Sequence, residues 1–163
     1  MMSVPLVRPA RPADHLFIHA QAGRLAGVAD LPWRSAGEVM RFQQAFMHEV
    51  LDAPKPGAVT LVAEGTGEVG GARGECLGFV HAEPMADLFT GKVAAYIPLL
   101  AVTPAAEGQG VAQALMAAVE GWARAQGYES LSLDVFASNR RGRAFYARMG
   151  YGEESLRLVK DIR

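Results

Sequence analysis

A glycine-containing turn near residue 108 connects a predicted strand to a predicted helix. Its small residues are Gly108, Gly110 and Ala112. The first backbone N–H groups of a helix have no internal partner and carry the positive end of the helix dipole. Small residues at this point let a phosphate group approach those N–H groups closely. The residue types and their spacing therefore indicate a site for a diphosphate.

Three other interpretations of these glycines can be tested against the surrounding residues. A dinucleotide-binding turn would have Gly or Ala at the third small position, where this chain has Gln113. A nucleoside triphosphate loop would require Gly-Lys followed by Ser or Thr, which the chain lacks. The simplest alternative is that the glycines only shape a tight turn between strand and helix. A second motif further along the chain favours cofactor binding over a plain turn.

That second motif is residues 139–151, with the sequence N-R-R-G-R-A-F-Y-A-R-M-G-Y. Together with the turn at Gly108, it resembles the acetyl-CoA-binding core of the GCN5-related N-acetyltransferase (GNAT) family. The family pattern Gln/Arg-x-x-Gly-x-Gly/Ala corresponds to residues 107–112, where Gly110 and Ala112 match and Glu107 does not. The resemblance is close in the second half of the chain and extends to the first half only in the order of elements. It implies an enzyme that uses acetyl-CoA as its acetyl donor.

The resemblance also implies a role for individual residues of the cofactor site. The backbones of Leu100 and Val102 would bind the pantetheine arm where two strands splay apart, and Asn139 would bind the cofactor at the entry of the last helix. Tyr146 would return a proton to the departing CoA thiolate. The residues that this assignment gives to the cofactor are Leu100, Val102, Gly108, Gly110, Val111, Ala112, Asn139 and Tyr146.

Several of these residues have a purely structural alternative. Asn139 is equally a good helix N-cap, and Tyr146 could be a packed aromatic residue. Arg140, Arg141 and Arg143 could meet a cofactor phosphate or form a solvated helix face.

The attacking amine must lose a proton before it can add to a thioester, so a general base is expected. Many members of the family have a Glu on the strand equivalent to residues 93–102, but this strand has no carboxylate and offers only Tyr96. Glu83, which follows the preceding strand, is our first candidate for a catalytic base. Asp87 and His81 are alternatives, and each of the three could also be a surface group.

His15 and His19 are four residues apart on a predicted helix, so one metal ion could bind both. No third ligand is evident in the sequence. We therefore expect no metal site.

The elements that must position these residues follow from hydrophobic periodicity and turn residues. Strands are predicted at residues 4–8, 58–64, 76–82, 93–102 and 131–135, with a last strand beginning near Tyr151. Helices are predicted at residues 14–26, 108–126 and 141–149, and one more begins at Ser35 in a capping box with Glu38. In that helix the residues predicted to face the core are Val39, Phe42, Phe46 and Val50.

This order, β-α-α-β-β-β-α-β-α-β, predicts one α/β domain over residues 1–163. By resemblance to GNAT proteins, we expect a mixed, twisted sheet with helices on both faces and a cleft between two splayed central parallel strands. Half of the residues are hydrophobic and a fifth are charged, which is typical of a globular chain and not of disorder.

The net charge and the cysteine content limit the expected binding partners and cellular location of the protein. Sixteen Lys and Arg against seventeen Asp and Glu give a net charge of −1, so neither nucleic acid nor an anionic membrane is expected as a partner. Cys76 is the only cysteine, and the chain start lacks the apolar stretch of a secretory signal. No apolar run approaches the roughly 20 residues of a membrane span. A cytoplasmic protein is predicted.

The combined expectation is an N-acetyltransferase in which an amine attacks acetyl-CoA directly. The acceptor would be a primary amine on a small molecule or peptide, and a homodimer is one expectation because dimers are common in the family. The alternative is a non-catalytic acyl-CoA-binding or regulatory module of the same fold, which Glu107 and the missing strand carboxylate favour. A generic nucleotide-binding protein is a third reading.

Overall fold

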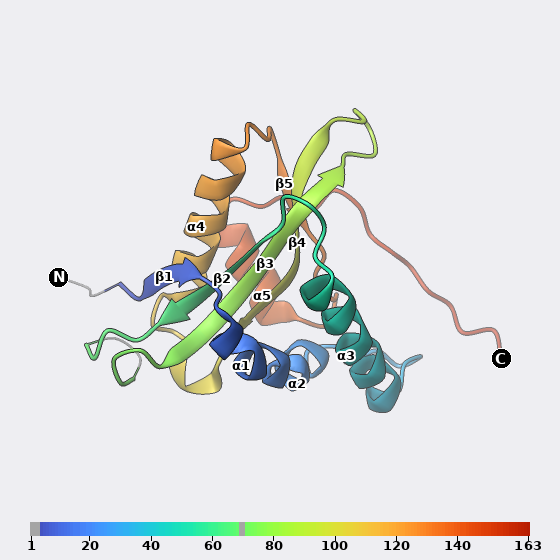
Figure 1. Ribbon diagram of the computed structural model, residues 1–163. Helices are drawn as coiled ribbons and strands as arrows, with labels where there is room; N and C mark the ends of the chain where they lie inside the picture. The colour runs from blue at the N-terminus through green and yellow to red at the C-terminus, as the bar shows by residue number, and fades with distance from the viewer. Residues whose placement is uncertain (1–3, 69–70) are drawn as a thin grey trace.

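The computed structural model describes residues 4–68 and 71–163. Five strands form one sheet in the order β1-β2-β3-β4-β5, in which only β4 and β5 are parallel neighbours (Figure 1). The strands are β1 Leu6–Pro9, β2 Val59–Glu64, β3 Cys76–Ala86, β4 Val93–Val102 and β5 Leu131–Leu133. The helices are α1 His15–Ala20, α2 Ala22–Ala26, α3 Ala36–Asp52, α4 Val111–Ala125 and α5 Arg140–Arg148, with short 3-10 helices at Pro12–Asp14 and Pro104–Ala106. The mixed α/β class predicted from the sequence is confirmed.

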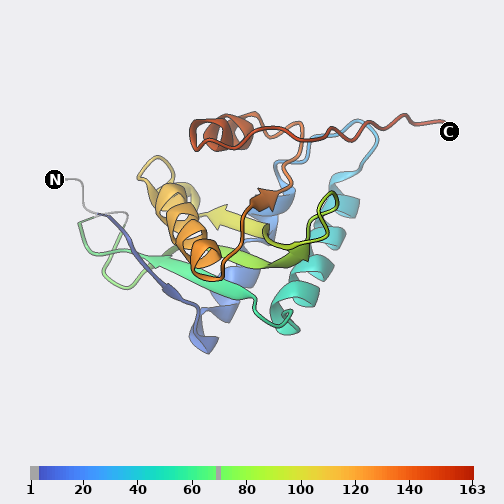
Figure 2. The ribbon, with the colours of Figure 1, turned by 90° about the horizontal axis from the view of Figure 1, so that it is seen from above.

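Helices cover both faces of the sheet, because each face of the strands buries its own set of apolar side chains. On one face, Leu115 and Met116 of α4 pack against Val80 of β3 and Ile97 of β4. On the other face, α1, α2 and α3 pack against a set that includes Val62, Phe79, Leu99 and Ala101. Figure 2 shows α5 beyond the β5 end of the sheet, and none of its residues is fully buried.

The longest helix, α3, begins as the sequence predicts, and its inward face agrees with the prediction at Val39, Phe46 and Val50. The Ser35 hydroxyl accepts from the Glu38 backbone N–H, and Glu38 accepts from the Ser35 N–H, which completes the capping box. The buried residues are Val39, Gln43, Met47 and Val50. The prediction that Phe42 faces the core was wrong, since its side chain is 59% exposed and stacks on Phe46 at 5.6 Å between ring centroids.

Several predicted boundaries differ from the structure. The helix predicted over residues 14–26 is divided into a 3-10 turn, α1 and α2, and the helix predicted from Gly108 begins at Val111. The strand predicted to end at residue 82 continues to Ala86, so Glu83 lies within β3. Val135 lies beyond β5, which ends at Leu133 and leaves Val135 36% exposed.

The predicted last strand does not form. Tyr151 is fixed by a bond from its N–H to the Tyr146 carbonyl and by its hydroxyl on Glu120, but residues 152–163 have no regular structure and run away from the sheet (Figure 2). A strand needs a neighbouring edge to pair with, and β5 offers an edge only three residues long. In the described structure the parallel pair therefore stands at the edge of the sheet, not at its centre.

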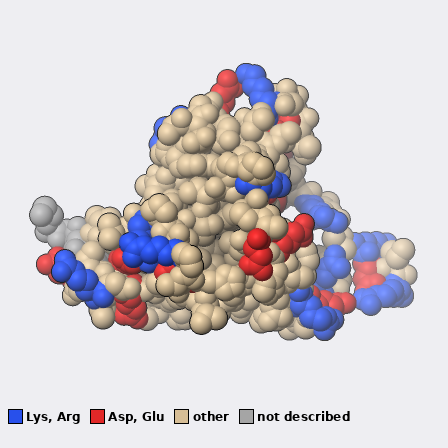
Figure 3. Space-filling view, viewed as in Figure 1, with Lys and Arg blue, Asp and Glu red and all other residues tan. Residues whose placement is uncertain are grey.

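Within residues 4–68 and 71–163, no helix has the length and apolar character needed to span a membrane. On the face seen in Figure 3, basic and acidic side chains lie side by side, mainly around the lower rim.

Candidate functional site

The turn before α4 has the backbone geometry of an anion-binding site. Gly108 and Gly110 have φ of 75° and 78°, the left-handed region that glycine adopts without strain. Gly110 is the N-cap of α4, and it offers no side chain to satisfy the free N–H groups of the first turn. Those groups, which include the N–H groups of Val111 and Ala112, can therefore donate to a bound anion.

Beside this turn the two parallel strands separate. Their pairing runs from Ala95 opposite Leu131 to Ile97 opposite Leu133 and then stops, while β4 continues to Val102. The register between β3 and β4 shifts by one residue between His81 and Glu83, which is a bulge where β4 contains Ile97 and Pro98. Along the rest of β4, which includes Leu100 and Val102, the edge on the β5 side has no strand partner in the described structure.

Glu107, which departs from the family pattern, lies between two arginines. Its two carboxylate oxygens accept from Arg141 of α5 and Arg24 of α2. These two arginines, Arg141 first, lower the pKa of Glu107. Arg24 also donates from Nε to the carbonyl oxygen of Val102 at 3.2 Å. The positive charges of Arg24 and Arg141 therefore compensate the Glu107 carboxylate. The three side chains link α2, the turn before α4, and α5.

Asn139 has the structural role that its sequence position allows. Its side-chain oxygen accepts from the Gly142 N–H at 2.9 Å, which makes it the N-cap of α5. A Cβ at position 142 would come within 2.5 Å of the Asn139 amide nitrogen, so a larger residue there would displace the capping side chain. Arg143 of the same helix pairs with Glu153 at 2.7 Å.

Tyr146 is packed, but its hydroxyl has no hydrogen-bond partner among the described residues. Its ring stands edge-on to Phe145 and Tyr151, with centroids 5.2 and 5.9 Å away, and contacts the core beneath α4. Burial raises the pKa of Tyr146 to about 12. Within the described residues no hydrogen bond to this hydroxyl is present, so the phenol keeps its proton and has it free to donate.

A polar cluster occupies the opposite face of the sheet, level with the bulge. Glu83 is 5% exposed and accepts from Lys55 at 2.7 Å, and the register places it opposite Tyr96 of β4. The Tyr96 hydroxyl donates to Asp134 at 2.9 Å, just beyond the last paired residue of β5. Burial, with the Asp134 hydrogen bond, raises the pKa of Tyr96.

The two alternative bases are placed less favourably. Asp87 accepts from the N–H groups of Phe89 and Thr90 and so closes the turn between β3 and β4. His81 is 1% exposed, shares a 2.8 Å hydrogen bond with the Thr60 hydroxyl, and has its other nitrogen 3.7 Å from Glu83. The sequence reasoning missed Lys55 and Asp134, because only the fold brings them to Glu83 and Tyr96.

The loop that precedes α3 is held close to the start of α5. The Ser138 hydroxyl donates to the Val28 carbonyl at 2.7 Å and accepts from the Asp30 N–H at 3.0 Å. Two hollows of about 460 and 470 Å³ lie elsewhere on the described surface, one beside His19 and His48 and the other beside Glu120 and Tyr151. The splayed strands and the turn before α4 suit a long, extended ligand whose diphosphate rests on a helix N-terminus.

Comparison with known proteins identifies the family of the chain. A model of the acetyltransferase (GNAT) family matches residues 25–151. A putative acetyltransferase from Pyrococcus furiosus has a similar structure, with 22% identity, a TM-score of 0.76, and coverage of 96% of this chain and 99% of that one. The aminoglycoside 6′-N-acetyltransferase AAC(6′)-Ig from Acinetobacter haemolyticus has 18% identity and a TM-score of 0.65, over 97% and 99% of the chains. No curated protein matches the sequence.

A third similar structure contains a cofactor analogue. AAC(6′)-Iy, bound to the bisubstrate analogue CoA-S-monomethyl-acetylneamine, has 20% identity and a TM-score of 0.67 over 99% of each chain. These similarities define the fold as the mixed α/β fold of the acetyltransferase structures. More narrowly, because the family match spans most of the chain, the protein belongs to the GNAT acetyltransferase family.

Proposed function

We propose that this protein transfers an acetyl group from acetyl-CoA to a primary amine by direct attack. The observation that carries the proposal is the junction of β4, β5 and α4. Strand pairing stops at Ile97, and the unpaired edge of β4 leads to a helix start with two left-handed glycines and free N–H groups. The pantetheine arm would pair with Leu100 and Val102, and the diphosphate would bind the N–H groups of Val111 and Ala112.

The residues at the two ends of this cleft fit the remaining parts of the cofactor. Gly108 and Gly110 leave room for the diphosphate, and Asn139 would border the cofactor from the start of α5. The roles of the two glycines and of Asn139 are proposed from the family resemblance and the geometry of the turn. Acetyl-CoA as donor agrees with the cytoplasmic location that we infer from the sequence.

Glu83 is the proposed general base. It lies on the face of the sheet away from α4, opposite Tyr96, and Lys55 compensates its charge. Glu83 and the nearby Asp134 together favour a cationic amine as the acceptor. Glu83 would take the proton of the attacking amine directly or through one water molecule, and an N–H of β4 near Leu100 would meet the oxyanion.

Tyr146 is the proposed general acid. When the thioester breaks, the sulfur of CoA leaves as a thiolate that must be protonated. Because burial raises the pKa of Tyr146 to about 12, the phenol is protonated at neutral pH and can donate a hydrogen bond to the departing sulfur. Complete transfer of its proton to a thiolate whose thiol has a pKa of about 8.5 is unfavourable, so water must return a proton to the phenolate. The Tyr146 hydroxyl has no competing protein partner in the described structure.

The direct test is turnover. Release of free CoA thiol is followed with acetyl-CoA and a panel of amines that includes an aminoglycoside, a polyamine and a peptide N-terminus. Aminoglycosides are included because similar structures, AAC(6′)-Ig among them, are named as aminoglycoside acetyltransferases. Amine-dependent thiol release, with the acetylated product seen by mass spectrometry, is the expected result. Acetyl-CoA binding without turnover of any amine would favour the non-catalytic module instead.

Substitution at Glu83 tests the base. Glu83→Gln is expected to lower kcat by about 100-fold or more at neutral pH while leaving acetyl-CoA affinity unchanged. Asp87→Asn is the matched control, because it changes the other acidic candidate and keeps the oxygen that accepts from Phe89 and Thr90. Equal losses in the two variants, or no loss in Glu83→Gln, would remove Glu83 from the mechanism.

A further inference from the structure

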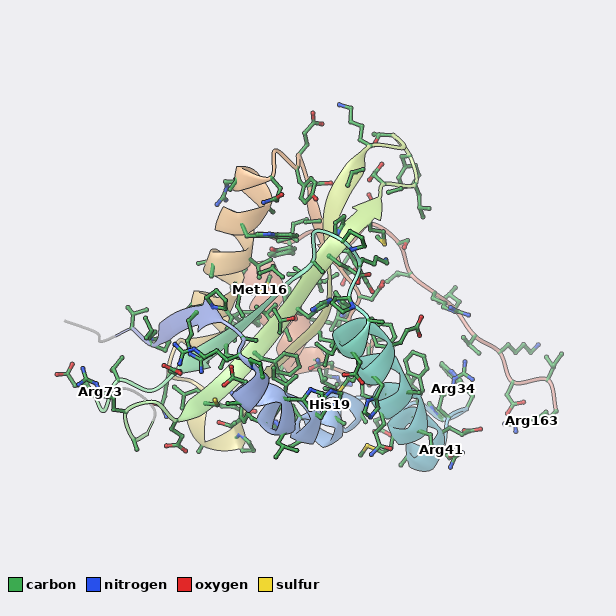
Figure 4. All side chains as sticks on the ribbon, in the orientation of Figure 1. His19, Arg34, Arg41, Arg73, Met116 and Arg163 are labelled. Atoms are coloured by element: carbon green, nitrogen blue, oxygen red, sulfur yellow. The ribbon has the colours of Figure 1, made fainter. Side chains whose placement is uncertain are left out.

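Three of the four histidines of the chain gather where α1 faces α3. The His15 and His19 rings have centroids 4.2 Å apart, and the His19 and His48 rings are stacked at 4.5 Å. Asp52, one turn after His48, completes the group. His15 and His19 come from α1 and His48 and Asp52 from α3, so two helices each contribute two side chains four residues apart. Figure 4 shows His19 between the two helices.

The central nitrogen of this group lacks a hydrogen bond. His19 Nε2 is fully buried and has no hydrogen-bond partner among the described residues. Its nearest opposite charge is Asp52 Oδ1, 3.4 Å away. An unsatisfied buried polar atom costs free energy, so its presence points to an interaction that a further ligand would complete.

Three ligand atoms of the group already lie close together. One ring nitrogen from each of His15 and His19 and one carboxylate oxygen of Asp52 lie within 4.8 Å of one another. Two ligands of a tetrahedral zinc ion with bonds of about 2.0–2.1 Å lie roughly 3.4 Å apart, which is the separation between His19 Nε2 and Asp52 Oδ1. Small rotations of the His15 side chain, which is exposed, would bring in the third ligand.

We propose that His15, His19 and Asp52 form a binding site for a divalent first-row transition cation, of which Zn²⁺ is the best suited. Two imidazoles and one carboxylate suit zinc, and three protein ligands leave a fourth position for water. The spacing of His15 and His19 suggested a shared metal ion, but we expected no site because the third ligand, Asp52, lies far along the chain from the two histidines. Only the packing of α3 beside α1 and α2 supplies the third ligand.

His48 is the proposed positioning residue. Its Nδ1 lies 2.7 Å from Asp52 Oδ2, the carboxylate oxygen that does not face His19. A ligating carboxylate is commonly held in this way by a hydrogen bond from a neighbouring group. The His48 ring also stacks on His19 and limits its rotation.

The ion would fasten the start of α1 to the end of α3. A surface hollow of about 460 Å³, lined by His19, Ala22, Gln44, Met47 and His48, opens beside the group and gives a route of entry. The two helices cover the sheet face that carries Glu83, so the ion would stabilise that layer. The site is separate from the proposed cofactor cleft, and its test does not depend on acetyl transfer.

The test uses untagged, metal-stripped full-length protein titrated with Co²⁺ and then with Zn²⁺. The expected result is one Co²⁺ per chain with the strong visible absorption of a four-coordinate ion, displaced by Zn²⁺, and a rise in Tm on Zn²⁺ addition. His19→Ala and Asp52→Asn are expected to weaken binding at least 10-fold and to abolish the rise in Tm. His48→Gln should weaken it about 10- to 100-fold, the usual effect of removing a group that orients a ligand.

Glu49→Gln is the matched control, because Glu49 is an exposed acid on α3 next to His48 and outside the group. It should bind Co²⁺ as the native protein does. All variants retain His81, so Co²⁺ binding to a histidine outside the group would be seen in every variant. Equal affinity in the native protein and His19→Ala, or no binding of either ion by native protein that circular dichroism shows to be folded, would overturn the proposal.

Discussion

Arg24 of α2 donates from its Nε to the carbonyl oxygen of Val102, the last residue of β4. The same guanidinium pairs with Glu107, whose second oxygen pairs with Arg141. The turn before α4 thus carries a carboxylate that is held by two arginines, which could otherwise face the diphosphate of the proposed cofactor.

We therefore expect Glu107→Gln to tighten acetyl-CoA binding. The change removes a negative charge from the start of α4 and frees Arg24 and Arg141 to interact with the cofactor. A charge at a helix N-terminus contributes about 0.3–1 kcal/mol, which corresponds to about a two- to fivefold lower Kd by calorimetry. Glu153→Gln, which removes a carboxylate paired with Arg143 on α5, is the control and should leave Kd unchanged. Weaker binding in Glu107→Gln would show that the carboxylate supports the site.

Comparison of Gly110→Ala with Gly127→Ala separates the effect of backbone strain from the effect on the proposed cofactor site. Both Gly110 and Gly127 have φ near 80°, and a Cβ at either position meets no close neighbour. Alanine at either should lower the free energy of unfolding by about 1–2 kcal/mol, measured by urea denaturation. Only Gly110→Ala should also weaken acetyl-CoA binding. Equal affinities in the two variants would contradict the placement of the diphosphate on the α4 turn.

Tyr146→Phe should change catalysis without changing stability. The hydroxyl has no hydrogen bond to lose in the described structure, so the free energy of unfolding should stay within about 0.5 kcal/mol of the native value. We expect kcat to fall about 100-fold or more. Tyr151→Phe is the reverse control: it loses the bond to Glu120, costs about 1 kcal/mol and leaves kcat unchanged. A Tyr146→Phe enzyme with native kcat would exclude the general-acid role.

His81 should make the fold sensitive to mild acid. Burial lowers the pKa of His81, although the facing Glu83 acts to raise it and Lys55 lowers it further. A histidine whose pKa is lower when folded contributes stability above its unfolded pKa of about 6.5 and loses it as pH falls below that value. The free energy of unfolding should therefore drop between about pH 7 and pH 5, and less so in His81→Gln. Parallel pH profiles for both proteins would contradict this assignment.

Local signals in the sequence predicted the starts and ends of several helices well. The Ser35 capping box, the Asn139 N-cap and the positive φ of Gly127 all depend on neighbours within a few residues, and the structure has each of them. The α4 helix and its turn were predictable for the same reason. Their roles in binding acetyl-CoA stay predictions.

The features that the sequence did not reveal depend on partners far apart in the chain. The end of β3 was predicted too early because Glu83 and Pro84 end its apolar run, and only Lys55 and the β4 register accommodate Glu83 within the strand. The last strand failed because its would-be partner β5 is short. Asp52 was not recognised beside His19 because helix packing, not spacing, brings the two together.

Calorimetry of acetyl-CoA binding tests the central claim most directly, with the native protein compared with Gly110→Glu. The substitution places a bulky carboxylate on the turn where the diphosphate is expected. We expect micromolar binding by the native protein, about −8 kcal/mol, that is lost in the variant while circular dichroism shows both proteins folded. No binding by the folded native protein, or equal binding by Gly110→Glu, would contradict it.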